Sequence, residues 1–167
     1  MELVSLNAGD GVLFGLDIPE HVNVWLQAAA LRPGDEAWAE QNLRRALAAN
    51  PDQIETYIAL TKLFCYRGRL DEAEEMALTA LDKAAVQAGV DRDWRRLGSA
   101  ATDWSLFDGP ARLLLYSLKA LAFISLRQQR LAHADDILGL LLSLDPLDRV
   151  GASVVRDIAK GVADDDD

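Results

Sequence analysis

The stretch GRLDEAEEMALTA at residues 68–80 decides the fold class. Gly68 opens a turn, and Ala73, Ala77 and Ala80 follow it at spacings of four and three residues. That spacing places the three alanines on one face of a helix. The segment therefore predicts a turn followed by a helix whose small residues allow close packing against a neighbour.

The same pattern occurs at two other places in the chain. Thirty-four residues earlier, Ala39 aligns with Ala73 and Ala46 aligns with Ala80. Sixty-one residues later, Ala134 aligns with Ala73. The second offset exceeds the first by about 27 residues, so the sequence predicts three copies with an insertion before the third.

Large side chains precede the turn in the best copy, where Tyr57, Leu60 and Phe64 lie at helical spacing. A helix with large residues, a turn and a helix with small residues over 34 positions resembles the tetratricopeptide repeat. The resemblance covers residues 20–53, 54–87 and 115–148. It implies an all-α fold in which helix-turn-helix pairs stack as a right-handed superhelix.

The rest of the chain is expected to complete a single domain over 1–167. Hydrophobic residues recur every four positions near the end and predict a capping helix over 149–163 that covers the last repeat. These residues are Val150, Val154, Ile158 and Val162. The remaining parts are an N-terminal arm at 1–19, the insertion at 88–114 and a tail of four aspartates at 164–167.

Acidic residues mark the expected helix starts. A carboxylate before a helix accepts hydrogen bonds from backbone N–H groups, and a Glu three residues later returns one. Asp108 followed by Pro110 predicts that the first helix of the third copy begins ahead of the repeat frame. The other expected caps are Asp17 with Glu20, Asp52 with Glu55, and Asp71 with Glu74.

Charge and composition exclude several classes of protein. There are 17 Lys and Arg residues against 27 Asp and Glu residues, a net charge of -10, so no nucleic-acid partner is expected. No apolar run reaches the roughly 18 residues that cross a bilayer, so no membrane association is expected. The single Cys65 and an N-terminus without a signal pattern predict a cytoplasmic location.

No constellation of catalytic residues is evident. The chain has two histidines and one cysteine and lacks the common metal, nucleotide and nucleophile motifs. Cys65 follows Phe64 with no histidine near it in the sequence, so a buried or groove-lining thiol is expected. We therefore expect no enzyme activity, no cofactor and no metal, with a cryptic enzyme or ligand-binding protein as an alternative.

The resemblance to tetratricopeptide repeats implies where a partner binds, because in that family the first helices line a concave groove for peptides. Aromatic side chains there supply rigid contact area, and Lys and Arg orient carboxylates. A short segment with apolar anchors and one or two carboxylates suits this composition. The implied peptide-binding residues are Ile58, Lys62, Tyr66, Tyr116, Lys119, Phe123 and Arg127.

This set leaves one alternative open and gives one test. Tyr66 and Phe123 are either groove residues or core residues that face the insertion. Lys119 and Arg127 lie eight residues apart on one helical face. If they line the groove, replacing both with Glu weakens partner binding at a nearly unchanged melting temperature.

The insertion has two interpretations. Trp94, Trp104 and Phe107 either plug the gap between the second and third copies or form an exposed aromatic platform. We favour the plug for Trp104, which Leu106, Phe107 and a helix cap follow closely. Trp94 lies among arginines, and both interpretations stay open for it.

The function that the resemblance implies is a noncatalytic adaptor or small chaperone that binds a protein or peptide segment. The acidic balance and the three copies are also similar to small tetratricopeptide chaperones of bacterial type III secretion. The segments FDGP at 107–110 and DRVGAS at 148–153 look like small repeat proteins encoded near bacterial nitrogen-fixation genes. A self-associating scaffold subunit of such a bacterial assembly, for example a homodimer, is the alternative.

Overall fold

The computed structural model describes residues 35–165, and this part of the chain is helical and without a strand. The all-α prediction is confirmed for these residues. The predicted arm at 1–19, the first helix of the 20–53 copy and the cap of Asp17 with Glu20 lie outside the described residues. The helices are α2 (Glu36–Ala49), α3 (Ile54–Tyr66), α4 (Leu70–Ala88), the short 3-10 helix η1 (Trp94–Arg96), α5 (Gly109–Arg127), α6 (Leu131–Leu144) and α7 (Ala152–Asp165).

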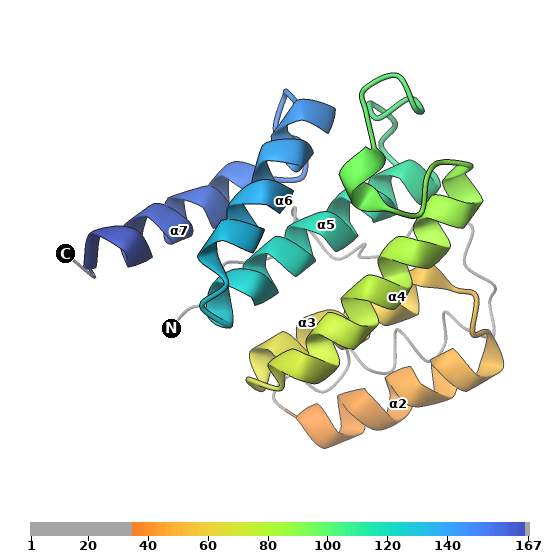
Figure 1. The fold of residues 1–167 in the computed structure, drawn as a ribbon. Helices are drawn as coiled ribbons and strands as arrows, with labels where there is room; N and C mark the ends of the chain where they lie inside the picture. The colour runs from red at the N-terminus through yellow and green to blue at the C-terminus, as the bar shows by residue number, and fades with distance from the viewer. Residues whose placement is uncertain (1–34, 166–167) are drawn as a thin grey trace.

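The helices pack in the order in which they occur in the chain (Figure 1). Helices α3 and α4 form one hairpin, α5 and α6 form a second, and α5 packs against α4. At one end α2 covers α3, and at the other α7 packs against α6 and α5. The apolar face of each helix is thereby buried against the next element.

The two hairpins turn in the same way. Gly68 and Gln129, which are 61 residues apart, both adopt left-handed backbone angles, with φ of 71° and 63°. The amide of Arg69 donates to the Phe64 carbonyl at 2.9 Å, and the amide of Arg130 donates to Ser125 at the same distance. These bonds satisfy carbonyls that would otherwise be left open at the helix ends. The turn predicted at Gly68 is confirmed, and its geometry recurs at the offset found in the sequence.

Small residues lie where the helices cross, as the spacing of alanines predicts. Ala73, Ala77 and Ala80 of α4 are buried between α3 and α5, and Ala134 of α6 is buried against α5. Ala46 of α2 is fully buried as well, whereas Ala39, which aligns with Ala73, is half-buried. A side chain of one carbon lets helix backbones approach closely, so larger residues on α3 and α5 fill the space between them.

Two of the predicted helix caps are wrong. The N-cap of α3 is Gln53, and the Asp52 carboxylate instead pairs with the Lys83 ammonium at 2.9 Å. The N-cap of α4 is Arg69, so Asp71 lies inside the first turn of the helix. These carboxylates face cations and amides of other helices, and the tertiary contacts take the place of local capping.

Asp108 does occupy the N-cap position of α5, with Pro110 in the first turn, so this helix begins ahead of the repeat frame as predicted. The last helix begins at Ala152, later than the predicted 149, because Asp148 caps it through the Ser153 amide at 3.2 Å. Val155 is buried, whereas Val154 of the predicted apolar stripe is exposed. Four-residue spacing drifts around a helix of 3.6 residues per turn, which explains the difference.

Among the described residues, α5 is long and apolar enough to cross a membrane by length and composition. Of its most apolar window, 78% is buried inside the fold. Such burial is typical of the central helix of a helical core.

Candidate binding site

The seven residues implied by the repeat frame lie on α3 and α5, and these helices contact each other. On α3, Ile58 and Lys62 are half-buried, and Tyr66 at the helix end is 62% exposed. On α5, Tyr116 and Arg127 are half-buried. Five side chains of the predicted set therefore keep exposed area on two neighbouring helices.

Lys119 and Phe123 are buried, contrary to the expectation that they line an accessible groove. Lys119 is 5% exposed, and its ammonium donates to the carbonyl of Val150 at 2.7 Å. Phe123 belongs to the hydrophobic core, as its alternative interpretation proposed. The sequence pattern missed this because α5 is covered by α4, α6 and α7 together, which leaves little of its surface free.

Burial shifts the pKa values of two side chains on α3. Desolvation lowers the pKa of Lys62 on α3. Desolvation also raises the pKa of the Cys65 thiol to about 11, although the charge of Arg127 acts in the opposite direction. The thiol is therefore protonated at neutral pH, which removes its nucleophilic form.

Arg112 is a functional candidate that the sequence reasoning missed. Its side chain lies seven residues before Lys119 on α5, and the residue is 8% exposed. One terminal nitrogen, Nη2, lies 3.2 Å from the Arg149 carbonyl and 3.4 Å from the Tyr116 hydroxyl. The other nitrogens, Nε and Nη1, are buried without a hydrogen-bond partner. The available signal was the seven-residue spacing of two cations in an otherwise apolar helix.

The insertion closes the gap beside α4 and α6. Trp94 and Trp104 are both buried, and the Trp104 indole N–H donates to the Gly98 carbonyl at 3.0 Å. Trp94 meets the ring of His133 edge to face, with 5.8 Å between ring centres. Both tryptophans are therefore plug residues, whereas Phe107 is 78% exposed and does not belong to the plug.

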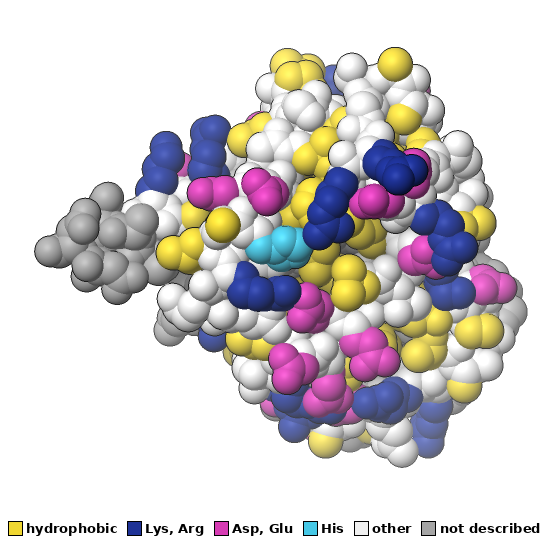
Figure 2. Space-filling view, in the orientation of Figure 1, with side chains coloured by type: hydrophobic (Ala, Val, Ile, Leu, Met, Phe, Trp, Pro, Cys, Tyr) yellow, Lys and Arg dark blue, Asp and Glu magenta, His cyan; other side chains and the backbone are white. Residues whose placement is uncertain are grey.

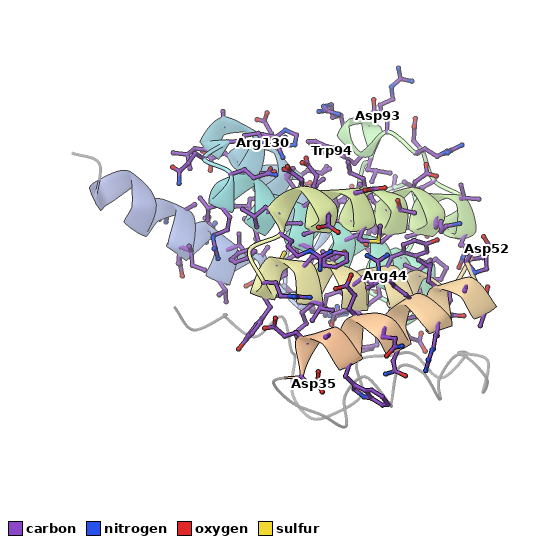
Figure 3. All side chains as sticks on the ribbon, turned by 90° about the horizontal axis from the view of Figure 1, so that it is seen from below. Asp35, Arg44, Asp52, Asp93, Trp94 and Arg130 are labelled. Atoms are coloured by element: carbon purple, nitrogen blue, oxygen red, sulfur yellow. The ribbon has the colours of Figure 1, made fainter. Side chains whose placement is uncertain are left out.

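A charge network joins α2 to the first hairpin. Glu40 of α2 pairs with Arg67 at 2.9 Å and with Arg69 at 2.7 Å. The hydrogen bond from Arg69 is the main reason that the pKa of Glu40 is lowered. Arg44, which also bonds Glu40, is turned from α2 toward α3 (Figure 3). Asp35 caps this helix by accepting from the Trp38 amide at 3.0 Å.

The same kind of ion pair joins the two hairpins. Arg130, which follows the second turn as Arg69 follows the first, pairs with Glu74 of α4 at 2.5 Å. Gln128 beside it donates to Asp71 and to Glu74. Figure 3 shows Arg130 and Trp94 on the side of α4 away from α2. The face in Figure 2 mixes both signs of charge around apolar side chains.

No group of three or more His, Cys, Asp and Glu side chains suitable for a metal ion occurs within residues 35–165. On α3 and α5 the predicted set offers the exposed ring of Tyr66, the half-buried guanidinium of Arg127 and the half-buried ammonium of Lys62. Such groups bind apolar anchors and carboxylates.

No protein-family model and no solved structure matches the chain. A curated relative is the uncharacterized 19.8 kDa protein in the nifW 5' region of Azotobacter chroococcum. The two are 27% identical over 142 residues, which is 84% of this chain and 78% of the relative. The chain is thus similar over most of its length to a protein encoded beside a nif gene.

Proposed function

We propose that the chain is a noncatalytic adaptor built of tetratricopeptide-type hairpins, which binds an acidic, apolar-anchored segment of a partner protein along α3 and α5. One observation carries the repeat assignment. The pair of Arg69 with Glu40 recurs as Arg130 with Glu74, offset by 61 residues at the arginine and 34 at the glutamate. These are the two offsets of the sequence repeat, so equivalent residues join consecutive copies.

The exposed members of the predicted set support the choice of surface. Tyr66 offers a large aromatic ring to solvent, and the half-buried Ile58 and Tyr116 add apolar area. Arg127 supplies a cation on the neighbouring helix. Exposed aromatic rings beside cations are typical of surfaces that anchor peptides. A cytoplasmic location accompanies this proposal, because the single cysteine is a buried thiol.

The position of the relative's gene in the nifW 5' region supports a bacterial setting related to nitrogen fixation. Within that setting we keep one second candidate, a self-associating scaffold subunit such as a homodimer. The observation that favours it is exposed apolar area outside α3 and α5, at Leu106, Phe107 and Leu147. Light scattering over a range of concentrations separates the two, because a scaffold gains mass with concentration and an adaptor stays monomeric.

Site-specific photocrosslinking tests the adaptor proposal. A benzophenone amino acid at Tyr66 is expected to capture a defined protein from an extract of the native host. The matched control carries the same group at Val86 of α4, which is similarly exposed on another helix. Arg127→Glu is expected to reduce the Tyr66 product. Equal capture at both positions, or none at Tyr66, contradicts a binding surface on α3 and α5.

A further inference from the structure

Two buried cations on α5 face the loop that precedes α7. Arg112 and Lys119 lie seven residues apart, which places them on one face of the helix. They donate to two consecutive carbonyls of that loop, Arg112 to Arg149 at 3.2 Å and Lys119 to Val150 at 2.7 Å. A neutral carbonyl compensates a buried charge less well than an anion does.

Arg112 lacks the most hydrogen-bond acceptors. Its Nε and Nη1 together carry three N–H groups, and both nitrogens are buried without an acceptor. Within residues 35–165, no carboxylate lies at ion-pair distance from Arg112, Lys119 or Arg149. A guanidinium that is more than nine-tenths buried and incompletely bonded is costly unless an anion binds it.

The acidic side chains of the adjacent loop already accept hydrogen bonds from groups of the loop and of the start of α7. Asp145 accepts from the Val150 amide at 2.9 Å, and Asp148 accepts from the amide and hydroxyl of Ser153. Burial lowers the pKa of Lys119, Asp148 opposes this shift, and the charge of Arg112 adds to it. The two cations therefore repel each other, and an added carboxylate stabilises both.

Exposed apolar side chains lie around Arg149, the residue whose carbonyl accepts from Arg112. The Arg149 guanidinium donates to the Ser105 carbonyl at 2.7 Å and lies 5.1 Å from the ring centre of Phe107. Phe107 and Leu106 are exposed, and so is Leu147 on the loop that carries Arg149. An inorganic anion makes no favourable contact with such apolar area. A peptide with an apolar side chain next to an acidic one can bury that area and pair with the cation.

We infer that Arg112, with Tyr116 and Arg149 at its rim, binds a carboxylate of an acidic peptide segment whose apolar neighbour packs on Phe107. The inference rests on the proposed adaptor function and adds a second contact point to it. The Tyr116 ring lies 5.1 Å from the Arg112 guanidinium and covers it on one side. Tyr116 is half-buried, so rotation of its side chain is the movement that the inference requires to admit the carboxylate.

Nuclear magnetic resonance of the full chain, labelled with nitrogen-15 in arginine, reports on this site directly. The probe is the peptide acetyl-Leu-Asp-Asp-Phe-Asp-Asp-amide. The Nε–H signal of Arg112 is expected to move saturably, because its N–H gains a charged acceptor. The signal of Arg130, whose charge is already paired with Glu74, is expected to stay in place. Inorganic phosphate is titrated in parallel.

Two variants test the contacts of Arg112 and Phe107 with the peptide, and the fluorescence anisotropy of a labelled peptide measures its affinity. Arg112→Gln is expected to weaken peptide binding about tenfold, as for loss of a charge-assisted bond. Phe107→Ala changes an exposed residue, so it keeps the fold and is expected to weaken binding about threefold. A peptide that binds without moving the Arg112 signal overturns the inference, while crosslinking at Tyr66 still tests the adaptor function. The inference also fails if phosphate moves the signal as far as the peptide does and Phe107→Ala has no effect.

Discussion

The ammonium of Lys119 in the middle of α5 donates to the carbonyl of Val150, across 31 residues of sequence, at 2.7 Å. The bond ties the central helix to the loop from which α7 starts. Because Lys119 is also 5% exposed, its charge is held inside the protein. The residue therefore serves the attachment of α7, and its charge is not available to a partner on α3 and α5.

Lys119→Glu is expected to destabilise the fold by about 3 to 5 kcal/mol, because it buries an unpaired carboxylate against the Val150 carbonyl. Urea denaturation monitored by circular dichroism measures the change. Arg127→Glu, at a half-buried position on the same helix, is the matched control and is expected to cost about 1 kcal/mol or less. Equal stability of the two variants contradicts a structural role for Lys119. The double substitution Lys119→Glu with Arg127→Glu is thus expected to unfold the protein before it reports on partner binding.

Gly151 is the residue after Val150, whose carbonyl accepts the hydrogen bond from Lys119. Its φ is 77°, and a Cβ at this position lies 3.3 Å from the Lys119 ammonium nitrogen. Gly151→Ala is expected to cost about 2 kcal/mol, because the left-handed conformation is strained for alanine and Lys119 is held by its hydrogen bond. Gly68→Ala is the control, since Gly68 has a φ of 71° and open space around its Cβ position. The control is expected to lose about 1 kcal/mol. Thermal unfolding of both variants measures the difference, and a loss at Gly68 as large as at Gly151 contradicts the contact.

The charge network around Glu40 gives a dependence of stability on pH. The pKa of Glu40 is below its ordinary value of 4.5 in the folded protein. A carboxylate whose pKa is lower in the folded state stabilises the protein above the unfolded pKa, and this contribution is lost as the pH falls through the folded pKa. Glu40→Gln is therefore expected to cost about 1 to 2 kcal/mol at pH 7 and progressively less below about pH 4.5.

Denaturant titrations at pH 7 and at pH 3 to 4 measure the difference between Glu40→Gln and the unchanged protein. Glu75→Gln is the control, because Glu75 is exposed on α4. Its effect is expected to stay within about 0.5 kcal/mol at both pH values. A cost for Glu40→Gln that is constant from pH 7 to pH 3 contradicts a folded-state ion pair.

The sequence predicts the hairpins better than it predicts the site, and the reason is the range of the interactions. The buried alanines and the turn at Gly68 follow from spacing within one segment, and the structure contains them as expected. The caps at Asp52 and Asp71 fail because distant side chains bind those carboxylates, the Lys83 ammonium at Asp52 and the Gln128 amide at Asp71. Lys119 is misplaced for the same reason, since its partner comes from a loop that no local pattern brings to α5.

Trp104 gives the sharpest test of the insertion. The residue is buried, and its indole N–H bonds the Gly98 carbonyl at 3.0 Å. Trp104→Ala removes a large buried ring and is expected to cost about 3 to 5 kcal/mol. Trp104→Phe keeps most of the ring and leaves the carbonyl without its donor, so it is expected to cost about 1 to 2 kcal/mol.

Phe107→Ala is the matched control, because this ring is 78% exposed and lies at the surface, 5.1 Å from the guanidinium of Arg149. Its loss of stability is expected to stay below about 1 kcal/mol, the size of an exposed cation–π contact. Urea titration of the three variants measures their free energies of unfolding and so ranks them by stability. If Trp104→Ala is as stable as Phe107→Ala, burial of Trp104 does not hold the insertion in the fold. The segment would then be an independent surface loop, and the binding surface would be expected on the insertion instead of on α3 and α5.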